Sequence, residues 1–234
     1  MRKLALCLVA MGFGCGGGGD PSLQQFFNDT ASIECQQIFQ CCDSTEIMDQ
    51  FQGLNPPITT ESGCVNSYQG LFQALLLPQM QASIDNGRMV YHADLAGACI
   101  DALDGLTCAE FSGFSSSSGV APAGCSDPFE GLVADGDPCA SDNECQSSYC
   151  EGDSSSQEGT CKQLPGDGAA CPDFDCADGF WCDFATGGGT CVATKADGTD
   201  CNGNDECQSG SCVDPDPNDT TPGMCGTQMI CDGM

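Results

Sequence analysis

The residues that could carry chemistry in this chain are above all its cysteines, which number 22 among 234 residues. Thiols form disulfides, bind metal ions or exchange electrons, and the last two uses favour pairs separated by two residues. No Cys-x-x-Cys pair occurs in the sequence, and its single histidine is His92. We therefore predict structural disulfides formed in an oxidising compartment, with no metal site and no cofactor.

Catalytic motifs are equally scarce. His92, beside Tyr91 and Asp94, is the one histidine that could act as a base, but a lone histidine near a helix start is more typical of a surface or capping residue. The sequence has no nucleophile elbow, no phosphate-binding loop and no H-E-x-x-H pair. We expect a protein that is not an enzyme and has no catalytic residues.

The chain is strongly acidic, with 34 Asp and Glu against 5 Lys and Arg and a net charge of −29. Removal of Arg2 and Lys3 with an N-terminal signal would change that charge to −31. So few cations cannot neutralise phosphates, which excludes nucleic acid as an expected partner, and an anionic membrane would repel the folded part. The acidity fits a soluble, self-repelling surface or a binder of divalent cations.

Three acidic segments bear on calcium. Asp214–Asn218 (Asp-Pro-Asp-Pro-Asn) is similar to the opening of a calcium loop but lacks its sixth-position Gly, and Cys225 stands where the twelfth-position acid belongs. Asp142–Cys145 and Asn204–Cys207 are similar to the start of calcium-binding epidermal-growth-factor modules, which also need a Cys-x-Cys that this chain lacks. Calcium ligands and solvated acidic loops both remain open interpretations.

Aromatic residues gather in one short segment around Cys176 and Cys182, while the neighbouring segments are almost free of them. The rings belong to Phe174, Phe180, Trp181 and Phe184. They either pack on the disulfides as a small core or form an exposed patch that anchors a partner, since Trp is enriched in binding hot spots.

The N-terminus carries a targeting signal. Residues 1–14 combine a basic start with an apolar run too short to span a bilayer, and residues 15–20 read Cys-Gly-Gly-Gly-Gly-Asp, a flexible tether. The pattern resembles a bacterial lipoprotein signal, although Gly12 stands where Leu is usual, and the resemblance implies a lipid on Cys15. Ordinary cleavage, with Cys15 unmodified, is the alternative.

Residues 21–110 are expected to form a helical domain. A first helix should begin near Asp20–Ser22, a second should cover Ser44–Gln52, a third should be interrupted at Pro78, and a fourth should begin near Asp94. Arg88–Tyr91 suits an extended passage. Residues 111–131, with a Ser115–Ser118 run, read as a linker.

Seven cysteines lie in or just after the helical domain, at positions 35, 41, 42, 64, 99, 108 and 125. The adjacent Cys41 and Cys42 should bond to different neighbours. Because seven is odd, one of these cysteines should bond outside the region, and Cys231 is a candidate partner.

Three repeats follow, over residues 132–163, 164–192 and 193–234, and we call them repeats 1, 2 and 3. Each reads (Ala/Gly)-Asp-Gly-x2-Cys, then two further cysteines at short spacing, a variable loop and Gly-x-Cys. The Asp-Gly pair suits a tight turn, the later Gly a turn or a close backbone crossing, and the third cysteine should pair with the first and the fourth with the second. The structural cysteines are Cys139, Cys145, Cys150, Cys161, Cys171, Cys176, Cys182, Cys191, Cys201, Cys207, Cys212 and Cys225.

With these repeats in view, residues 134–225 resemble the Dickkopf N-terminal cysteine-rich domain, through Cys139, Cys145, Tyr149-Cys150 and Cys161 and then Cys171, Cys176, Cys182 and Cys191. The whole layout resembles cysteine-rich bacterial lipoproteins. The resemblance implies a disulfide-framed extracellular binding module; the adjacent Cys-Cys and the basic character of the Dickkopf family are absent from the repeats.

The expected fold is small and disulfide-rich: an α-helical, disulfide-stapled N-terminal domain followed by three short cysteine-rich β-turn or hairpin modules. The expected function is an exported, outer-membrane or cell-surface lipoprotein that acts as a binding scaffold for an unknown extracellular protein, touching the membrane through its lipid only. A secreted form is the alternative location. A calcium-dependent adhesion or matrix element and an inhibitor of extracellular hydrolases are the alternative functions.

Overall fold

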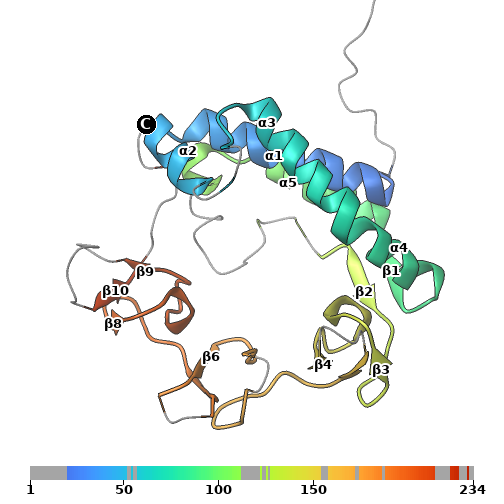
Figure 1. Ribbon diagram of the computed structural model, residues 1–234, viewed down its shortest axis with the longest axis vertical. Coiled ribbons are helices and arrows are strands. Elements are labelled where there is room, and N and C mark those ends of the chain that lie inside the picture. The colour runs from blue at the N-terminus through green and yellow to red at the C-terminus, as the bar shows by residue number, and fades with distance from the viewer. Residues whose placement is uncertain are drawn as a thin grey trace, which may run out of the picture.

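The computed structural model describes residues 20–51, 54, 57–111, 122, 125, 127–153, 158–171, 174–185, 188–213, 222–226 and 231. Helices occupy the N-terminal part and small antiparallel sheets the rest (Figure 1). None of the helices in the described part is both long and apolar enough to cross a membrane. The structure thus confirms a disulfide-rich protein with helices first and small sheets after them.

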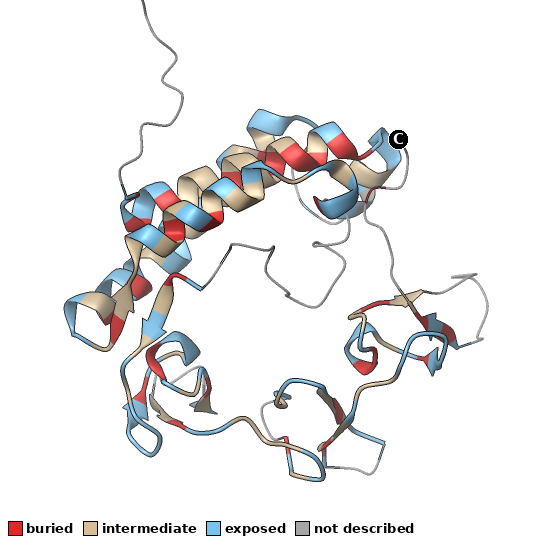
Figure 2. Cartoon of the chain, turned by 180° about the vertical axis from the view of Figure 1, so that it is seen from behind, coloured by how far each residue is buried: buried red, intermediate tan, exposed pale blue. Residues whose placement is uncertain are grey.

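The first helix, α1 (Leu23–Cys41), begins where the sequence predicted. Ser22 is its N-cap, and the Ser22 hydroxyl accepts a hydrogen bond from the Gln25 amide at 3.2 Å. The helices α2 (Ser44–Gln50), α3 (Glu61–Leu71) and α5 (Ala93–Asp104) are also close to their expected places. Along α1 the side chains that face α3 and α5 are buried, as the red residues of Figure 2 show.

The helical run after α3 corrects one expectation, because Pro78 does not interrupt it. α3 continues through a π-helix, η1 (Phe72–Leu76), directly into α4 (Leu77–Asp85). At this junction the Leu77 N–H donates to the Phe72 carbonyl, five residues back. Pro78 follows this π-turn directly, and the altered hydrogen bonding of the junction accommodates a residue without an N–H inside the continuous helical run.

Four disulfides tie the helical region together and to the end of the chain. They are Cys35–Cys64, Cys41–Cys108, Cys42–Cys231 and Cys99–Cys125. The predictions that Cys41 and Cys42 bond to different partners, and that the odd cysteine bonds to Cys231, are confirmed. The first three bonds belong to one core cluster, beside apolar side chains such as Ile38 and Phe51. Cys99–Cys125 belongs to a second cluster, with Phe26 and Ala96.

A two-stranded sheet pairs a strand between α4 and α5 with one after the helices, and it shortens the expected linker. β1 (Met89–Tyr91) pairs antiparallel with β2 (Phe129–Gly131), with Val90 opposite Glu130. The linker expected over 111–131 therefore ends before Phe129, since the Phe129 ring packs against Phe26 and Tyr91 and a free linker would leave it in water. The Ser115–Ser118 run lies outside the described residues.

Each repeat contains its own small sheet. Repeat 1 has β3 (Pro138–Cys139), β4 (Cys150–Asp153) and β5 (Glu158–Cys161) in the order β3-β5-β4; repeat 3 has β8 (Asp200–Cys201), β9 (Cys212–Val213) and β10 (Gly223–Cys225) in the order β8-β10-β9. Repeat 2 has β6 (Phe180–Asp183) paired with β7 (Thr190–Ala193). Short 3-10 helices, η2 (Asp142–Glu144) and η3 (Asn204–Glu206), precede the second cysteine of repeats 1 and 3.

The cysteines of the repeats pair first with third and second with fourth, as predicted. The pairs are Cys139–Cys150, Cys145–Cys161, Cys171–Cys182, Cys176–Cys191, Cys201–Cys212 and Cys207–Cys225. Each repeat buries its own cluster of disulfide sulfurs. Units of about thirty residues have little other apolar surface to bury, so the disulfides take the place of a core.

The Gly of each Gly-x-Cys motif lies too close to a cysteine sulfur for any residue with a Cβ to replace it without a shift. A Cβ added at Gly223 would lie 2.8 Å from Cys212 Sγ, and one at Gly189 would lie 3.0 Å from Cys182 Sγ. The chain therefore crosses directly over the third cysteine of the repeat, which confirms the predicted close backbone crossing.

The elements follow one another around a loop that closes on itself. In Figure 1 the helices lie along one side and the sheets of repeats 1, 2 and 3 continue in an arc back toward α2. The Cys42–Cys231 bond joins the two ends of that arc across 189 residues of sequence.

Candidate functional site

The aromatic residues of repeat 2 divide into two groups. Phe180 lies on β6 and packs against the buried disulfide cluster of its repeat. Phe174 and Phe184 flank the sheet and are 70% and 48% exposed, with ring centroids 5.0 Å apart. Phe180 is thus half-buried against the disulfides, whereas Phe174 and Phe184 lie together at the surface.

The backbone at Phe174 is unusual. Its φ is +73°, in the left-handed region, where Gly and Asn are the residues normally found. A bulky side chain there costs about 1–2 kcal/mol relative to the right-handed region. The contact with the Phe184 ring offsets part of that cost, but the Phe174 ring is otherwise exposed, and such outliers are concentrated at functional sites.

A cleft of 590 Å³ opens beside these rings, between repeat 2 and repeat 3. Phe174, Phe180 and Trp181 contribute its apolar wall. The exposed carboxylates of Asp178 and Asp205 lie on opposite sides of it, and neither forms an ion pair within the described residues. The cleft therefore combines an apolar wall with an acidic rim.

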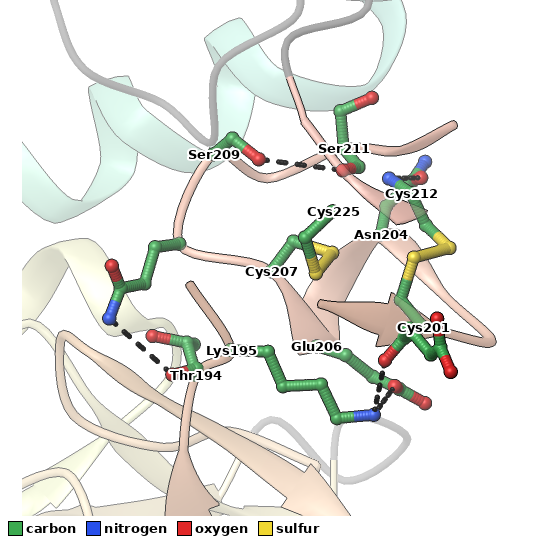
Figure 3. Close-up of a disulfide and its surroundings, with 12 residues drawn as sticks. Thr194, Lys195, Cys201, Asn204, Glu206, Cys207, Ser209, Ser211, Cys212 and Cys225 are labelled. Atoms are coloured by element: carbon green, nitrogen blue, oxygen red, sulfur yellow. Dashed lines mark hydrogen bonds and ion pairs between the residues drawn. A yellow bond between two sulfur atoms is a disulfide. The ribbon is translucent and has the colours of Figure 1, made fainter. Parts of the chain in front are cut away.

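Trp181 connects the two repeats. Lys195 Nζ lies 5.9 Å from the centroid of the Trp181 ring, within the range of a cation–π contact, and also donates to the Asp200 carbonyl at 3.1 Å. The same ammonium forms an ion pair with the buried Glu206 (Figure 3). The buried Trp181 Nε1–H has no hydrogen-bond acceptor among the residues that the structure describes.

Glu206 has a counterpart in repeat 1. Glu144, 2% exposed, accepts hydrogen bonds from the Ser83 hydroxyl at 2.7 Å and the Ala140 amide at 2.8 Å, and pairs with Arg88 at 2.8 Å. Burial by itself raises the pKa of Glu144, but these hydrogen bonds and the charge of Arg88 outweigh it and hold that pKa below its ordinary value. Burial also raises the pKa of Glu206, but the hydrogen bonds from Lys195 and Asn202 and the charge of Lys195 outweigh it and hold that pKa below its ordinary value.

These contacts bear on the calcium interpretation. In the two segments similar to calcium-binding modules, Asp142 Oδ1 accepts from the Cys150 amide at 2.7 Å, and Asn204 Oδ1 accepts from the Cys212 amide at 2.8 Å. Glu144 and Glu206 are held by cations of this chain. These side-chain oxygens, which a calcium-binding module would use as ligands, thus form hydrogen bonds and ion pairs within the protein. Asp214–Asn218 lies outside the described residues.

The other predicted residues have definite places. His92 precedes α5 without capping it, and its Nε2 lies 2.9 Å from Glu130 Oε2 on β2. The groups of three cysteine sulfurs that lie within metal-binding distance of one another belong to disulfides. Cys15, the predicted lipid attachment site, lies outside the described residues.

The buried glutamates are the residues that sequence reasoning missed. Both occur in the motif Glu-Cys-Gln, at Glu144–Gln146 and Glu206–Gln208, and in both the Gln side chain donates to a backbone carbonyl at the start of its own repeat. The repetition of Glu-Cys-Gln in repeats 1 and 3, and its absence from repeat 2, was the available signal.

Comparison of the chain with known protein families, with curated proteins and with solved structures finds no match. What the molecule does must therefore be argued from its own residues.

Proposed function

We propose that this protein is a non-enzymatic, exported scaffold, anchored through a lipid on Cys15, whose three disulfide-stapled modules present the cleft between repeats 2 and 3 to another extracellular protein. The observation that carries the proposal is Phe174: a large exposed ring held at a left-handed backbone position next to a second exposed ring, Phe184. Folding alone favours Gly or Asn at that position. Export is supported by the 20 paired cysteines of the described residues, which require an oxidising compartment.

The chemistry of the cleft indicates the kind of partner. Aromatic rings are anchors of protein interfaces, and the carboxylates of Asp178 and Asp205 favour a positively charged segment beside an apolar one. The net charge of −29 adds long-range attraction for a basic partner. We therefore expect binding that weakens as salt is raised.

The test places a photo-crosslinking phenylalanine analogue at Phe174, at Phe184 and, as a control, at the exposed Leu54 of the helical region, in cells that export the chain. We expect Phe174 and Phe184 to capture the same partner and Leu54 to capture none of it. Equal capture from all three positions, or no capture from Phe174 and Phe184, would show that the cleft does not bind the partner.

A second variant separates binding from folding. Phe174→Asn removes the ring but suits the left-handed backbone, so its thermal stability should equal or exceed that of the parent while capture through Phe184 is lost. Full capture by a Phe174→Asn chain would show that the exposed ring is not an anchor.

A further inference from the structure

One long stretch of this acidic chain carries no charge at all. Residues 62–84 contain no Asp, Glu, Lys, Arg or His, although the whole sequence has 34 acidic residues. The stretch covers most of α3, all of η1 and nearly all of α4, so that a continuous helical run of the molecule is electrically neutral.

The neutral run also exposes three leucines. Leu71, Leu75 and Leu76 are 48%, 54% and 40% exposed. Leu75 lies four residues after Leu71, the spacing that places two side chains on one helix face. Leu76 lies five residues after Leu71, which is the hydrogen-bonding period of the π-helix η1. We call these three residues the leucine surface.

The helical run that carries the leucine surface also packs against the start of α1, near the N-terminal end of the described residues. Leu23, at the start of α1, packs with Met80 of α4, and the Tyr91 hydroxyl of β1 donates to the Pro21 carbonyl at 3.0 Å. From Cys15 to Asp20 there are only five residues, which span at most about 17 Å when fully extended. A lipid on Cys15 would therefore hold this end of the helical region within about 17 Å of the bilayer.

We propose that the leucine surface rests on the lipid bilayer, in the zone between headgroups and acyl chains, when the protein is anchored through Cys15. This inference rests on the proposed lipid anchor. Charge selects this surface, because the acidic remainder of the chain is repelled by anionic headgroups whereas residues 62–84 are not. In Figure 1, β6 of repeat 2 lies on the opposite side of the molecule from α3.

The experiment imposes the tether, so that it does not depend on natural acylation. In residues 15–234 the 20 later cysteines are in disulfides, which leaves the Cys15 thiol for coupling to a maleimide lipid in phosphatidylcholine vesicles. Two variants each carry one tryptophan in a Trp181→Phe background: Leu75→Trp on the leucine surface, and Leu54→Trp as a control at another exposed leucine. Bromine-labelled acyl chains quench a tryptophan that enters the bilayer boundary.

We expect quenching of the Leu75→Trp chain to exceed that of the Leu54→Trp chain by at least about threefold, because an interfacial apolar face sinks about 5–10 Å into the boundary. Adding Leu71→Gln and Leu76→Gln should abolish the difference while leaving thermal stability unchanged. Equal quenching of the two chains would overturn the inference. So would a dimer of the untethered protein that Leu71→Gln disrupts, since the surface would then bind a second copy. The mass of the chain from its native host separately tests whether Cys15 is acylated.

Discussion

Glu144 offers the sharpest test of how the helical region and repeat 1 are held together. Its carboxylate, 2% exposed, joins three donors: the Ser83 hydroxyl of α4, the Arg88 guanidinium before β1 and the Ala140 amide of repeat 1. Glu144→Gln keeps the shape but removes the charge. Hydrogen bonds to charged groups contribute about 1.5–3 kcal/mol each, and Gln can retain part of them. Arg88 is one-third exposed and can turn to water. We therefore expect a loss of about 2 kcal/mol at pH 7.

The pH dependence follows from the lowered pKa. In the unfolded chain the Glu144 pKa returns to its ordinary value of 4.5, and in the folded protein it lies below that. The contribution of the carboxylate is therefore fully present above pH 4.5 and is lost as the pH falls through the folded pKa. The stability difference between the parent and Glu144→Gln should be largest at pH 7 and should shrink toward pH 2.

The measurement is guanidinium unfolding at several pH values, combined with amide hydrogen exchange at Ala140, which reports the opening of this contact directly. Glu206→Gln is the matched control, because Glu206 is held by Lys195 and Asn202 of its own repeat. It should loosen repeat 3 and leave exchange at Ala140 unchanged. A difference for Glu144→Gln that is as large at pH 2 as at pH 7 would refute the charge-based reasoning.

Further predictions concern the repeats and the closure of the chain. Ser148 has φ +55° where repeat 3 has Gly210 at +66°, so Ser148→Gly should raise, and Gly210→Ser lower, the thermal stability, each by about 0.5–1 kcal/mol. Gly159→Ala should lower the free energy of unfolding in denaturant by about 1–3 kcal/mol, because its Cβ would collide with Cys150 Sγ. The control Gly166→Ala, at a position with open space around it, should keep the parental stability. Replacing both Cys42 and Cys231 by Ser should lower stability by about 4 kcal/mol; the other disulfides shorten the 189-residue loop in the unfolded chain to roughly 70 residues, and a loss near zero would contradict this loop-entropy argument. Millimolar calcium should not shift the melting temperature, and a shift reversed by chelator would restore the calcium alternative.

Spacing alone predicted much of the repeats. The constant phase of the cysteines indicated three equivalent four-cysteine units, and the structure gives all three the expected first-to-third and second-to-fourth pairing. Spacing did not by itself select this pairing, because four cysteines allow three connectivities. Gly-x-Cys and Asp-Gly were also readable, since a close crossing and a left-handed turn each need a residue without Cβ: Gly136, Gly168 and Gly198 all have positive φ. These features depend on neighbours in sequence, and sequence shows such neighbours directly.

Tertiary structure decided what depends on distant partners. The helical run continues through Pro78 because a π-turn directly before it accommodates the missing N–H. Phe129 joins a sheet because its ring packs against Phe26 and Tyr91. Glu144 became a buried anchor only because Ser83 and Arg88, about sixty residues away, supply its hydrogen-bond donors. Phe174 and Phe180 are indistinguishable by type, but the backbone turn at Phe174 leaves its ring exposed, whereas β6 places Phe180 half-buried against the disulfides. The spacing of residues along the sequence thus predicted the turns and the four-cysteine units. Burial and exposure depended on which distant segments the folded chain brings together.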